Sequence, residues 1–269
     1  MIGKYCIFNG KLIKTKKAVL PIDHIEFAYG FGCYENLRMR KHVVYHLDEH
    51  IDRLFDSAKM IDLKHNLDTT DIKKSVGKLI EKNKIENGNI KMILIGGKKP
   101  ICYIFMLPPK YVEKKEYRQG VKVVTYDYER FMPQAKILNM LPSYVIFKQA
   151  QKENAYDALL IDNTRHVTEG TRSNFFVIKE KTLTTPPLSE VLDGVTRRTV
   201  IECAKQNEYK IKEEQIPLKN IFDYDGAFLT NTSGKIVPIK TIDEKSFDTI
   251  PDNLQTLRKL YDKHISHNA

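Results

Sequence analysis

Three short stretches of the sequence carry residues that could do chemistry together. Lys136 follows the irregular stretch 126–135 and directly precedes a predicted helix. Glu169 lies in a turn that enters a predicted strand, and residues 194–196 (Gly-Val-Thr) come directly before another predicted helix. A lysine amine can bond covalently to a carbonyl carbon, a carboxylate can pair with a protonated nitrogen, and a helix N-terminus can hold an anion.

These three abilities are what pyridoxal phosphate (PLP) demands of a protein. A lysine must form a Schiff base with it, a carboxylate must keep its pyridine nitrogen protonated, and cationic and backbone donors must hold its phosphate. Alone, each candidate has an ordinary explanation: Lys136 as a surface lysine, Glu169 as a turn acid and Gly194 as a turn glycine. Only their joint presence makes PLP chemistry the working hypothesis.

Two other motifs point to different chemistry and are weaker. The stretch from His46 to His50 fits the H-x-x-E-H pattern of inverted zinc proteases, but the predicted helix begins inside it, which spoils the ligand spacing. Gly30 and Gly32 resemble the start of a dinucleotide-binding fingerprint, but Glu35 stands in place of the third glycine and a strand follows. We therefore expect neither a metal site nor a dinucleotide site.

The first part of the chain mixes strands and helices. Asn9-Gly10 predicts a tight hairpin turn, and Asp48 is placed as a possible N-cap of a helix from Leu47. The predicted elements are a hairpin over 4–8 and 11–14, a loop within 26–40 that feeds two strands, the helix from residue 47, a helix over 71–83, and strands over 90–95 and 101–106.

A Lys-rich stretch over 108–120, opened by two prolines, predicts a linker. Beyond it we expect a strand over 121–125, a helix over 137–151, strands over 158–161 and 175–178, a helix over 196–206, strands over 226–230 and 236–238, and a helix over 254–264. Strands and helices do not alternate strictly, which favours an α+β fold over a doubly wound sheet.

Composition narrows the class of protein further. The 269 residues carry a net charge of +10, with 42% hydrophobic and 29% charged residues, but the lysines are scattered and form no basic stripe. We expect no nucleic-acid partner. The four cysteines are far apart and no apolar run is long enough to span a membrane, so we expect a cytoplasmic protein that binds no membrane.

Seven blocks of sequence, in order, resemble the fold-type IV PLP enzymes, that is, the class IV aminotransferase family. They are FAYGFGCYENLR (27–38), HLDEHIDRLFDSAK (46–59), KILNML (136–141), DALLIDNTRHVTEGTRSNFFV (157–177), LTTPPL (183–188), LDGVTRRTVIECA (192–204) and FLTNTSGKIVPI (228–239). The family contains branched-chain aminotransferases, D-amino acid aminotransferases and aminodeoxychorismate lyases. The resemblance covers nearly the whole chain.

The resemblance implies a role for each matching residue. Lys136 matches the Schiff-base lysine, Glu169 the acid at the pyridine nitrogen, and Arg53 the arginine that grips the phosphate. The further cofactor-binding residues implied are Ser173, Asn174, Gly194, Val195, Thr196 and Thr232. The implied substrate-binding residues are Tyr29, Tyr34, and Ser233 and Gly234, whose turn would receive the substrate carboxylate. Lys91 is a further candidate for binding substrate, although it replaces the family's usual arginine.

The resemblance also implies an architecture. We expect a small N-terminal α/β domain over 1–118 and a larger C-terminal pseudo-barrel domain over 119–269, which would carry Lys136, with the cofactor between them. The family works as homodimers, in which the neighbouring subunit contributes pocket residues.

The reaction stays open between several possibilities. An aminotransferase acting on a branched-chain or similar apolar L-amino acid and a 2-oxo acid is the leading hypothesis, and an aminodeoxychorismate lyase is the alternative. The R-x-H element of D-amino acid enzymes is absent from GGKKPICY (96–103). Lys91 and Met140 stand where branched-chain enzymes usually have arginine and tyrosine. A non-catalytic homologue would not need Lys136, Glu169 and Arg53.

Overall fold

The structure, a computed structural model, describes residues 1–267 and divides into two compact units. The first unit contains residues 1–110 and 135–140, and the second contains 111–134 and 141–267. Segment 135–140, which carries Lys136, is expected in the second domain from sequence but groups with the first unit. The reason is that its backbone bonds to strand β3 (Gly32–Arg40): Tyr34 N donates to the Lys136 carbonyl over 3.0 Å, and Leu138 N to that of Gly32 over 2.8 Å.

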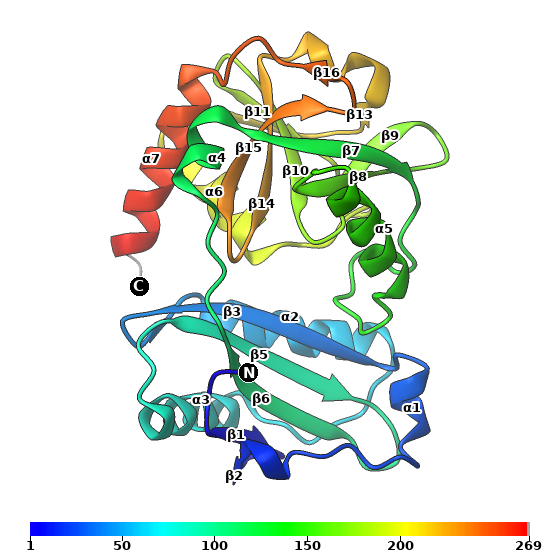
Figure 1. The fold of residues 1–269 in the computed structure, drawn as a ribbon, viewed down its shortest axis with the longest axis vertical. Coiled ribbons are helices and arrows are strands. Elements are labelled where there is room, and N and C mark those ends of the chain that lie inside the picture. Colours follow the sequence, from blue (N-terminus) through cyan, green and yellow to red (C-terminus); the bar gives the residue numbers. More distant parts are fainter. Residues whose placement is uncertain (268–269) are drawn as a thin grey trace. The chain divides into compact units, whose positions relative to one another are not determined.

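The first unit is one antiparallel sheet with two long helices on one face (Figure 1). Its strands have the order β2-β1-β6-β5-β3-β4. Its elements are β1 (Tyr5–Phe8), β2 (Lys11–Lys14), the 3-10 turn η1 (Thr15–Lys17), α1 (Ile25–Ala28), β3, β4 (Val43–Val44), α2 (Leu47–Met60), α3 (Thr69–Asn83), β5 (Gly88–Ile95) and β6 (Ile101–Leu107).

The two helices α2 and α3 cover the sheet with apolar residues at helical spacing. Ile51, Leu54 and Ala58 of α2, together with Val76 and Leu79 of α3, are buried in one core with alternate residues of β3, β5 and β6. The predicted hairpin around Asn9-Gly10 and both predicted helices are confirmed, since β1 pairs with β2 from Tyr5 to Lys14.

Three details of the first unit differ from expectation. The loop predicted within 26–40 is mostly strand β3, in which Glu35 takes a buried position that an apolar residue would normally hold. The N-cap of α2 is His46 in the left-handed conformation, and Asp48 lies in the first turn, where a negative charge favours the helix dipole. Helix α3 begins earlier than predicted, because the Asp68 side chain caps it by accepting from Thr70 N and Asp71 N.

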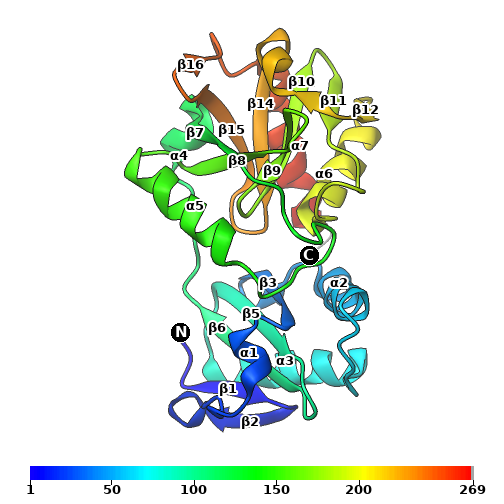
Figure 2. The ribbon, with the colours of Figure 1, turned by 90° about the vertical axis from the view of Figure 1, so that its right-hand side faces the viewer.

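The second unit contains the remaining elements. They are α4 (Lys114–Gln119), β7 (Val121–Asp127), α5 (Leu141–Lys152), β8 (Asp157–Ile161), β9 (His166–Gly170), β10 (Asn174–Lys179), β11 (Thr182–Thr185), α6 (Val195–Gln206), β12 (Lys210–Glu213), β13 (Ile216–Pro217), η2 (Leu218–Asp223), β14 (Gly226–Asn231), β15 (Lys235–Ile242), β16 (Lys245–Ser246) and α7 (Asp252–His267). Figure 2 shows α5, α6 and α7 around the strands of this unit.

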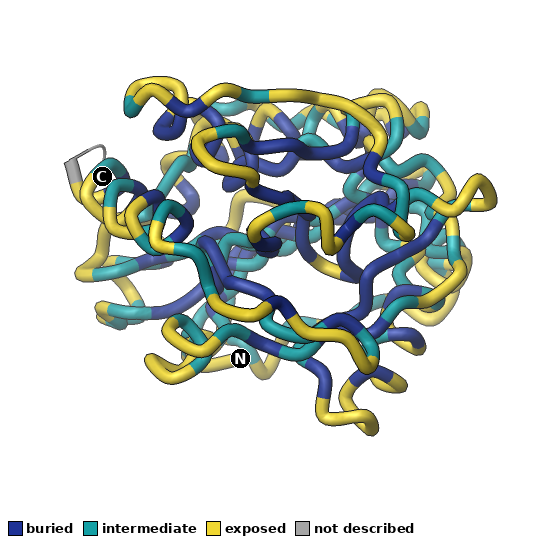
Figure 3. Tube along the Cα trace, turned by 90° about the horizontal axis from the view of Figure 1, so that it is seen from above, coloured by how far each residue is buried: buried dark blue, intermediate teal, exposed yellow. Residues whose placement is uncertain are grey.

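The central sheet of the second unit closes on itself. The ring runs β7-β8-β9-β10-β14-β15 and returns to β7 through a parallel pairing. The closing pair joins β9 to β10, with Glu169 opposite Asn174. Alternate residues of all six strands form one apolar core. Figure 3 colours the chain trace by burial, with buried stretches in dark blue and exposed stretches in yellow. The predicted α+β class with a barrel-like second domain is confirmed.

Helix α5 begins later than predicted. The expected helix over 137–151 starts only at Leu141, and residues 135–140 are irregular, with one isolated β-bridge between Ile137 and Cys33. Pro142 gives the reason, because proline is tolerated in the first turn of a helix but clashes with the preceding turn in its interior. No helix in the described part of the chain, residues 1–267, is long and apolar enough to cross a membrane.

Candidate functional site

Lys136 is held by main-chain bonds on both of its sides. Its N–H donates to Ser57 Oγ on α2 over 3.0 Å, and its carbonyl accepts from Tyr34 N on β3 over 3.0 Å. Its side chain is half-buried, with Nζ 4.9 Å from the centroid of the Tyr34 ring. The amine is therefore carried by a backbone that the strand and the helix fix in place.

Tyr34 and Lys91 lie on the neighbouring strands β3 and β5 of the sheet that the Lys136 segment contacts. Lys91 Nζ on β5 lies 3.5 Å from the Tyr34 ring centroid, within cation–π distance. Burial lowers the pKa of Lys91 from 10.5 to about 8, a shift that Glu35 opposes and the charge of Lys110 adds to. The structure thus brings two amines, those of Lys91 and Lys136, to one aromatic ring.

Arg53 lies on α2 and contacts a buried carboxylate. Its Nε donates to Glu35 Oε1 over 2.6 Å and its Nη2 donates to Glu35 Oε2 over 2.8 Å. His50, one turn earlier on the helix, has Nδ1 2.7 Å from Glu35 Oε2. All three side chains are buried. The arginine expected to grip phosphate is therefore part of a three-residue cluster that ties α2 to β3.

The charges of this cluster follow from its partners. Although burial alone would raise the pKa of Glu35, the charges and hydrogen bonds of Arg53 and His50 hold it well below its usual range. Burial lowers the pKa of His50, and the nearby charge of Glu35 only partly offsets this. Glu35 is then an ionised acceptor, and a neutral His50 donates its Nδ1–H to it.

Glu169 is a buried carboxylate with partners on both oxygens. Arg130 Nη1 donates to its Oε1 over 2.5 Å. Its Oε2 lies 3.4 Å from the donor Leu192 N and 3.5 Å from Asn174 Nδ2. The structure therefore places the two predicted residues Glu169 and Asn174 together and adds Arg130, which lies in the irregular stretch before Lys136.

Helix α6 begins at Gly194, which has no side chain to cap the first amides. Val195 and Thr196 are buried in its first turn, and the amides at a helix N-terminus can hold an anion. A Cβ at Gly194 would lie 2.0 Å from Asn174 Oδ1, and Asn174 Nδ2 donates to Leu192 O over 2.8 Å. This donor set, a glycine-led helix start beside the Glu169 carboxylate, fits the phosphate and the pyridine of PLP.

Ser173 belongs to a network that shapes the turn after Glu169. Its Oγ donates to Asp157 Oδ2 over 2.9 Å, and Thr171 Oγ1 bonds the other oxygen of the same carboxylate. A Cβ at Gly170 would lie 2.2 Å from Ser173 Oγ, so only glycine fits there. Ser173 therefore positions the turn, and its hydroxyl is engaged with Asp157.

The turn after β14 is closed by the side chain of Asn231, the last residue of that strand. The amides of Ser233 and Gly234, which are expected to receive the substrate carboxylate, both donate to Asn231 Oδ1, over 3.1 and 2.6 Å. Thr232, at the start of this turn, is half-buried. A substrate carboxylate at these amides would have to replace the oxygen of Asn231.

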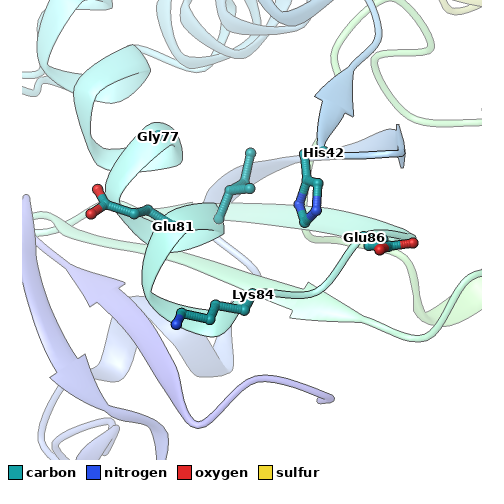
Figure 4. Close-up of a pocket in the computed structure, with 6 residues that line it drawn as sticks. His42, Gly77, Glu81, Lys84 and Glu86 are labelled. Carbon is teal, nitrogen blue, oxygen red and sulfur yellow. The ribbon is translucent and has the colours of Figure 1, made fainter.

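The remaining sequence motifs do not form the kinds of site that their patterns suggest. Tyr29, at the end of α1, is 74% exposed. His46 bonds Glu49 while His50 bonds Glu35, and residues 1–267 contain no group of three or more side chains that could hold a metal ion. A surface hollow of about 560 Å³ (Figure 4) contains none of the predicted residues and is lined by His42, Gly77, Ile80, Glu81, Lys84 and Glu86.

Sequence reasoning missed several residues that hold the predicted ones. Glu35 and His50 hold Arg53, Arg130 holds Glu169, and Asn231 occupies the substrate turn. A signal existed for Glu35, since a charged residue breaks the apolar alternation of its strand. Arg130 lies in an irregular stretch, where no periodicity could single it out.

Comparison with known proteins identifies the relatives of this arrangement. The model of the family described as amino-transferase class IV matches residues 32–242. A D-alanine aminotransferase of Bacillus licheniformis is 28% identical, over 93% of this chain and 94% of its own. A Methanocaldococcus jannaschii protein, provisionally named a branched-chain-amino-acid aminotransferase, is 31% identical over 87% of this chain and 86% of its own.

The fold is also found among solved structures. An aminotransferase of Mycobacterium tuberculosis, described as hypothetical and solved in a PLP-bound form, superposes with a TM-score of 0.88. The match covers 98% of this chain and 99% of that one, at 22% sequence identity. At 22% identity, this likeness is evidence for the fold alone.

Proposed function

The chain belongs to the class IV aminotransferases, which makes it a PLP-dependent transaminase, and we propose that its amino donor is a branched-chain or similar apolar L-amino acid. The amino group would pass to a 2-oxo acid. The observation that carries the proposal is a half-buried amine, that of Lys136, in a chain that also buries a carboxylate, Glu169, whose two oxygens are both held. The M. jannaschii relative supports the choice of substrate.

Each part of the cofactor has a candidate ligand among the residues described above. PLP, when bound, supplies an electron sink for the charge that develops at the α-carbon of the amino acid. Glu169 would accept the pyridine N–H, and Arg130 holds that carboxylate in place. Arg53, Thr232 and the first turn of α6 would hold the phosphate.

Lys136 Nζ would carry the proton that leaves the α-carbon of the substrate. Its main chain is fixed by Ser57 and Tyr34, so the amine can move only about its own side-chain bonds. A general base must lie within hydrogen-bond reach of the proton it takes, and a fixed backbone with a movable side chain meets that need. The same amine returns the proton in the second half of the transfer.

The substrate would be held by its carboxylates and its side chain. The amides of Ser233 and Gly234 would receive the α-carboxylate in place of Asn231 Oδ1. Lys91 would bind the second carboxylate of an acidic 2-oxo acid as a single point charge, because an ammonium lacks the two-pronged geometry of arginine. When the apolar amino acid is bound in place of the 2-oxo acid, the Tyr34 ring beside Lys91 would contact its side chain.

One assay panel tests the proposal. It follows 2-oxo acid formation from L-leucine, L-isoleucine, L-valine, L-glutamate and D-alanine, with 2-oxoglutarate or pyruvate as acceptor. We expect the branched-chain substrates to be the best donors. Lys136→Ala should abolish transfer and the visible absorbance of lysine-bound PLP, whereas Lys148→Ala, at an exposed lysine on α5, should preserve both.

The same panel separates the alternatives. Preference for D-alanine would overturn the choice of an L-amino acid, which matters because a D-alanine aminotransferase is among the relatives. Aminodeoxychorismate is included as a further substrate. Release of pyruvate from it, without amino transfer to 2-oxoglutarate, would favour the lyase.

The assembly we propose is a homodimer in the cytoplasm. The stretch before β3 exposes several apolar side chains, among them Val19, Ile22 and Tyr29, which a second copy would cover. An exposed Tyr29 suits a residue that completes the pocket of the neighbouring subunit. The four cysteines are buried and unpaired, which suits a reducing compartment. Light scattering after gel filtration tests the dimer, and Ile22→Lys should give monomers.

A further inference from the structure

Glu35 holds the guanidinium group of Arg53 by one edge. The two bonds, to Nε over 2.6 Å and to Nη2 over 2.8 Å, join two planar groups in parallel. Two such bonds fix the plane of the guanidinium as well as its place, whereas one bond would leave it free to turn. Through these two bonds, strand β3 fixes the orientation of Arg53.

The carboxylate of Glu35 is itself fixed. His50 Nδ1 lies 2.7 Å from Oε2, and the Asn36 amide lies 3.4 Å from the same oxygen. Glu35 is 0% exposed and His50 2% exposed, so neither side chain can exchange its partner for water. The cluster is a rigid support that reaches from the strand to the second turn of α2.

A purely structural need at this position would be met by an apolar residue. The neighbours on the same face of β3, Cys33, Leu37 and Met39, are apolar and fully buried. Burying a carboxylate costs free energy that its partners must offset, and replacing a buried ion pair by apolar residues is often neutral or stabilising. The pair therefore calls for a reason beyond packing, and the use of Arg53 supplies one.

We propose that Glu35 is the positioning residue of Arg53. By holding the Nε–Nη2 edge, it presents the guanidinium to the cofactor phosphate in one fixed orientation, and His50 keeps the carboxylate from turning. This inference rests on the proposed function, in which Arg53 binds the phosphate of PLP. Glu35 acts through Arg53, so its removal weakens the phosphate contact and leaves the rest of the cofactor site intact.

The test compares two ligands that differ only in the phosphate. Apo-protein is titrated with PLP and with pyridoxal, and dissociation constants are measured by equilibrium dialysis. Glu35→Gln should weaken PLP binding about tenfold or more, the effect of a lost charge-assisted hydrogen bond, with pyridoxal binding unchanged. Glu49→Gln is the matched control. Glu49 is a half-exposed glutamate that bonds His46, and it lies on α2, the helix that carries Arg53.

Two further variants keep the result decisive. Glu35→Asp retains the charge but is one methylene shorter, so it cannot hold both nitrogens of Arg53 in place. It should cause a smaller loss of PLP affinity, again with pyridoxal binding unchanged. This variant provides the test if Glu35→Gln does not fold. In an Arg53→Met background, Glu35→Gln should cause no further loss of PLP affinity. That result is expected only if Glu35 works through the guanidinium.

The possible failures are distinguishable. If Arg53→Met lowers PLP affinity selectively but neither Glu35 variant does, the positioning role is wrong and the proposed function stands. Equal losses of PLP and pyridoxal in the Glu35 variants would mean a general structural role and would also overturn the inference. If Arg53→Met leaves the ratio of the two affinities unchanged, the assignment of Arg53 to the phosphate fails first.

Discussion

Lys91 Nζ lies 3.5 Å from the centroid of the Tyr34 ring, across neighbouring strands of one sheet. Burial lowers the pKa of this lysine to about 8, so its charge changes within the range in which an enzyme can be assayed. A second amine, that of Lys136, lies 4.9 Å from the same ring. The lowered pKa of Lys91 therefore predicts that substrate binding depends on pH.

Binding of an acidic 2-oxo acid should weaken as pH rises through about 8, because Lys91 loses the proton that attracts the carboxylate. We expect kcat/KM for 2-oxoglutarate to fall above this pH, mainly through KM. Lys91→Met should lower kcat/KM at pH 7 and remove the pH dependence, while Lys91→Arg should move it beyond the accessible range. A wild-type profile that is flat from pH 7 to 9 contradicts the role.

Lys91 should also affect stability in a pH-dependent way. Its pKa in the folded state, about 8, lies below the ordinary 10.5, so the unfolded chain binds more protons between these values. The free energy of unfolding from this residue therefore rises with pH across that window and is lowest below it. Lys91→Met should raise the melting temperature at pH 7 and lose this advantage towards pH 10.5, as followed by circular dichroism.

Arg130 should matter to the cofactor as much as Glu169 does. Arg130→Met leaves the buried Glu169 without its cationic partner, so the carboxylate loses the contact that holds it in place for the pyridine N–H. We expect PLP affinity and kcat each to fall at least about tenfold. Arg165→Met, which removes the exposed ion pair with Asp127, is the control and should change neither.

Replacing glycine by alanine should have opposite effects at Gly194 and Gly77. Gly194→Ala places a Cβ 2.0 Å from Asn174 Oδ1, so the start of α6 must shift and PLP affinity should fall. Gly77→Ala lies in the exposed interior of α3 with no atom within 4 Å of the new Cβ. It should stabilise the protein by about 1 kcal/mol in urea unfolding and leave cofactor binding unchanged.

Asn231 should compete with the substrate. Asn231→Gly frees the amides of Ser233 and Gly234, which now donate to its side chain. If these amides receive the α-carboxylate, KM for the amino acid should fall with kcat little changed. A higher KM, with the melting temperature preserved, would mean that the asparagine itself binds substrate.

The candidate residues are predicted from sequence motifs, whereas the elements that hold them depend on long-range partners. Lys136, Glu169 and Arg53 follow from motif order, but residues 137–140 are largely apolar and suit either a helix or a strand. Pro142 could have excluded a helix start at residue 137. The irregular course of residues 135–140 depends on backbone bonds to β3, a long-range partner that local patterns do not record.

Glu35 shows a second limit of the same kind. Its strand alternates correctly, with Cys33, Leu37 and Met39 buried, although the aromatic residues and glycines of 26–40 had indicated a loop. The charge is compatible with the core because Arg53 and His50 meet it from α2. Such a pairing joins residues far apart in the chain, so the single sequence holds both partners without showing that they meet.

Segment 135–140 makes neither unit a continuous stretch of chain, because the polypeptide passes from one unit to the other at 110/111, 134/135 and 140/141. This has a consequence for synthesis on the ribosome. The edge of β3 near Tyr34 stays open until Lys136 and Leu138 have emerged, so the first unit is completed only after part of the second has been made. A fragment ending at residue 110 would therefore lack both that backbone partner and the reactive amine.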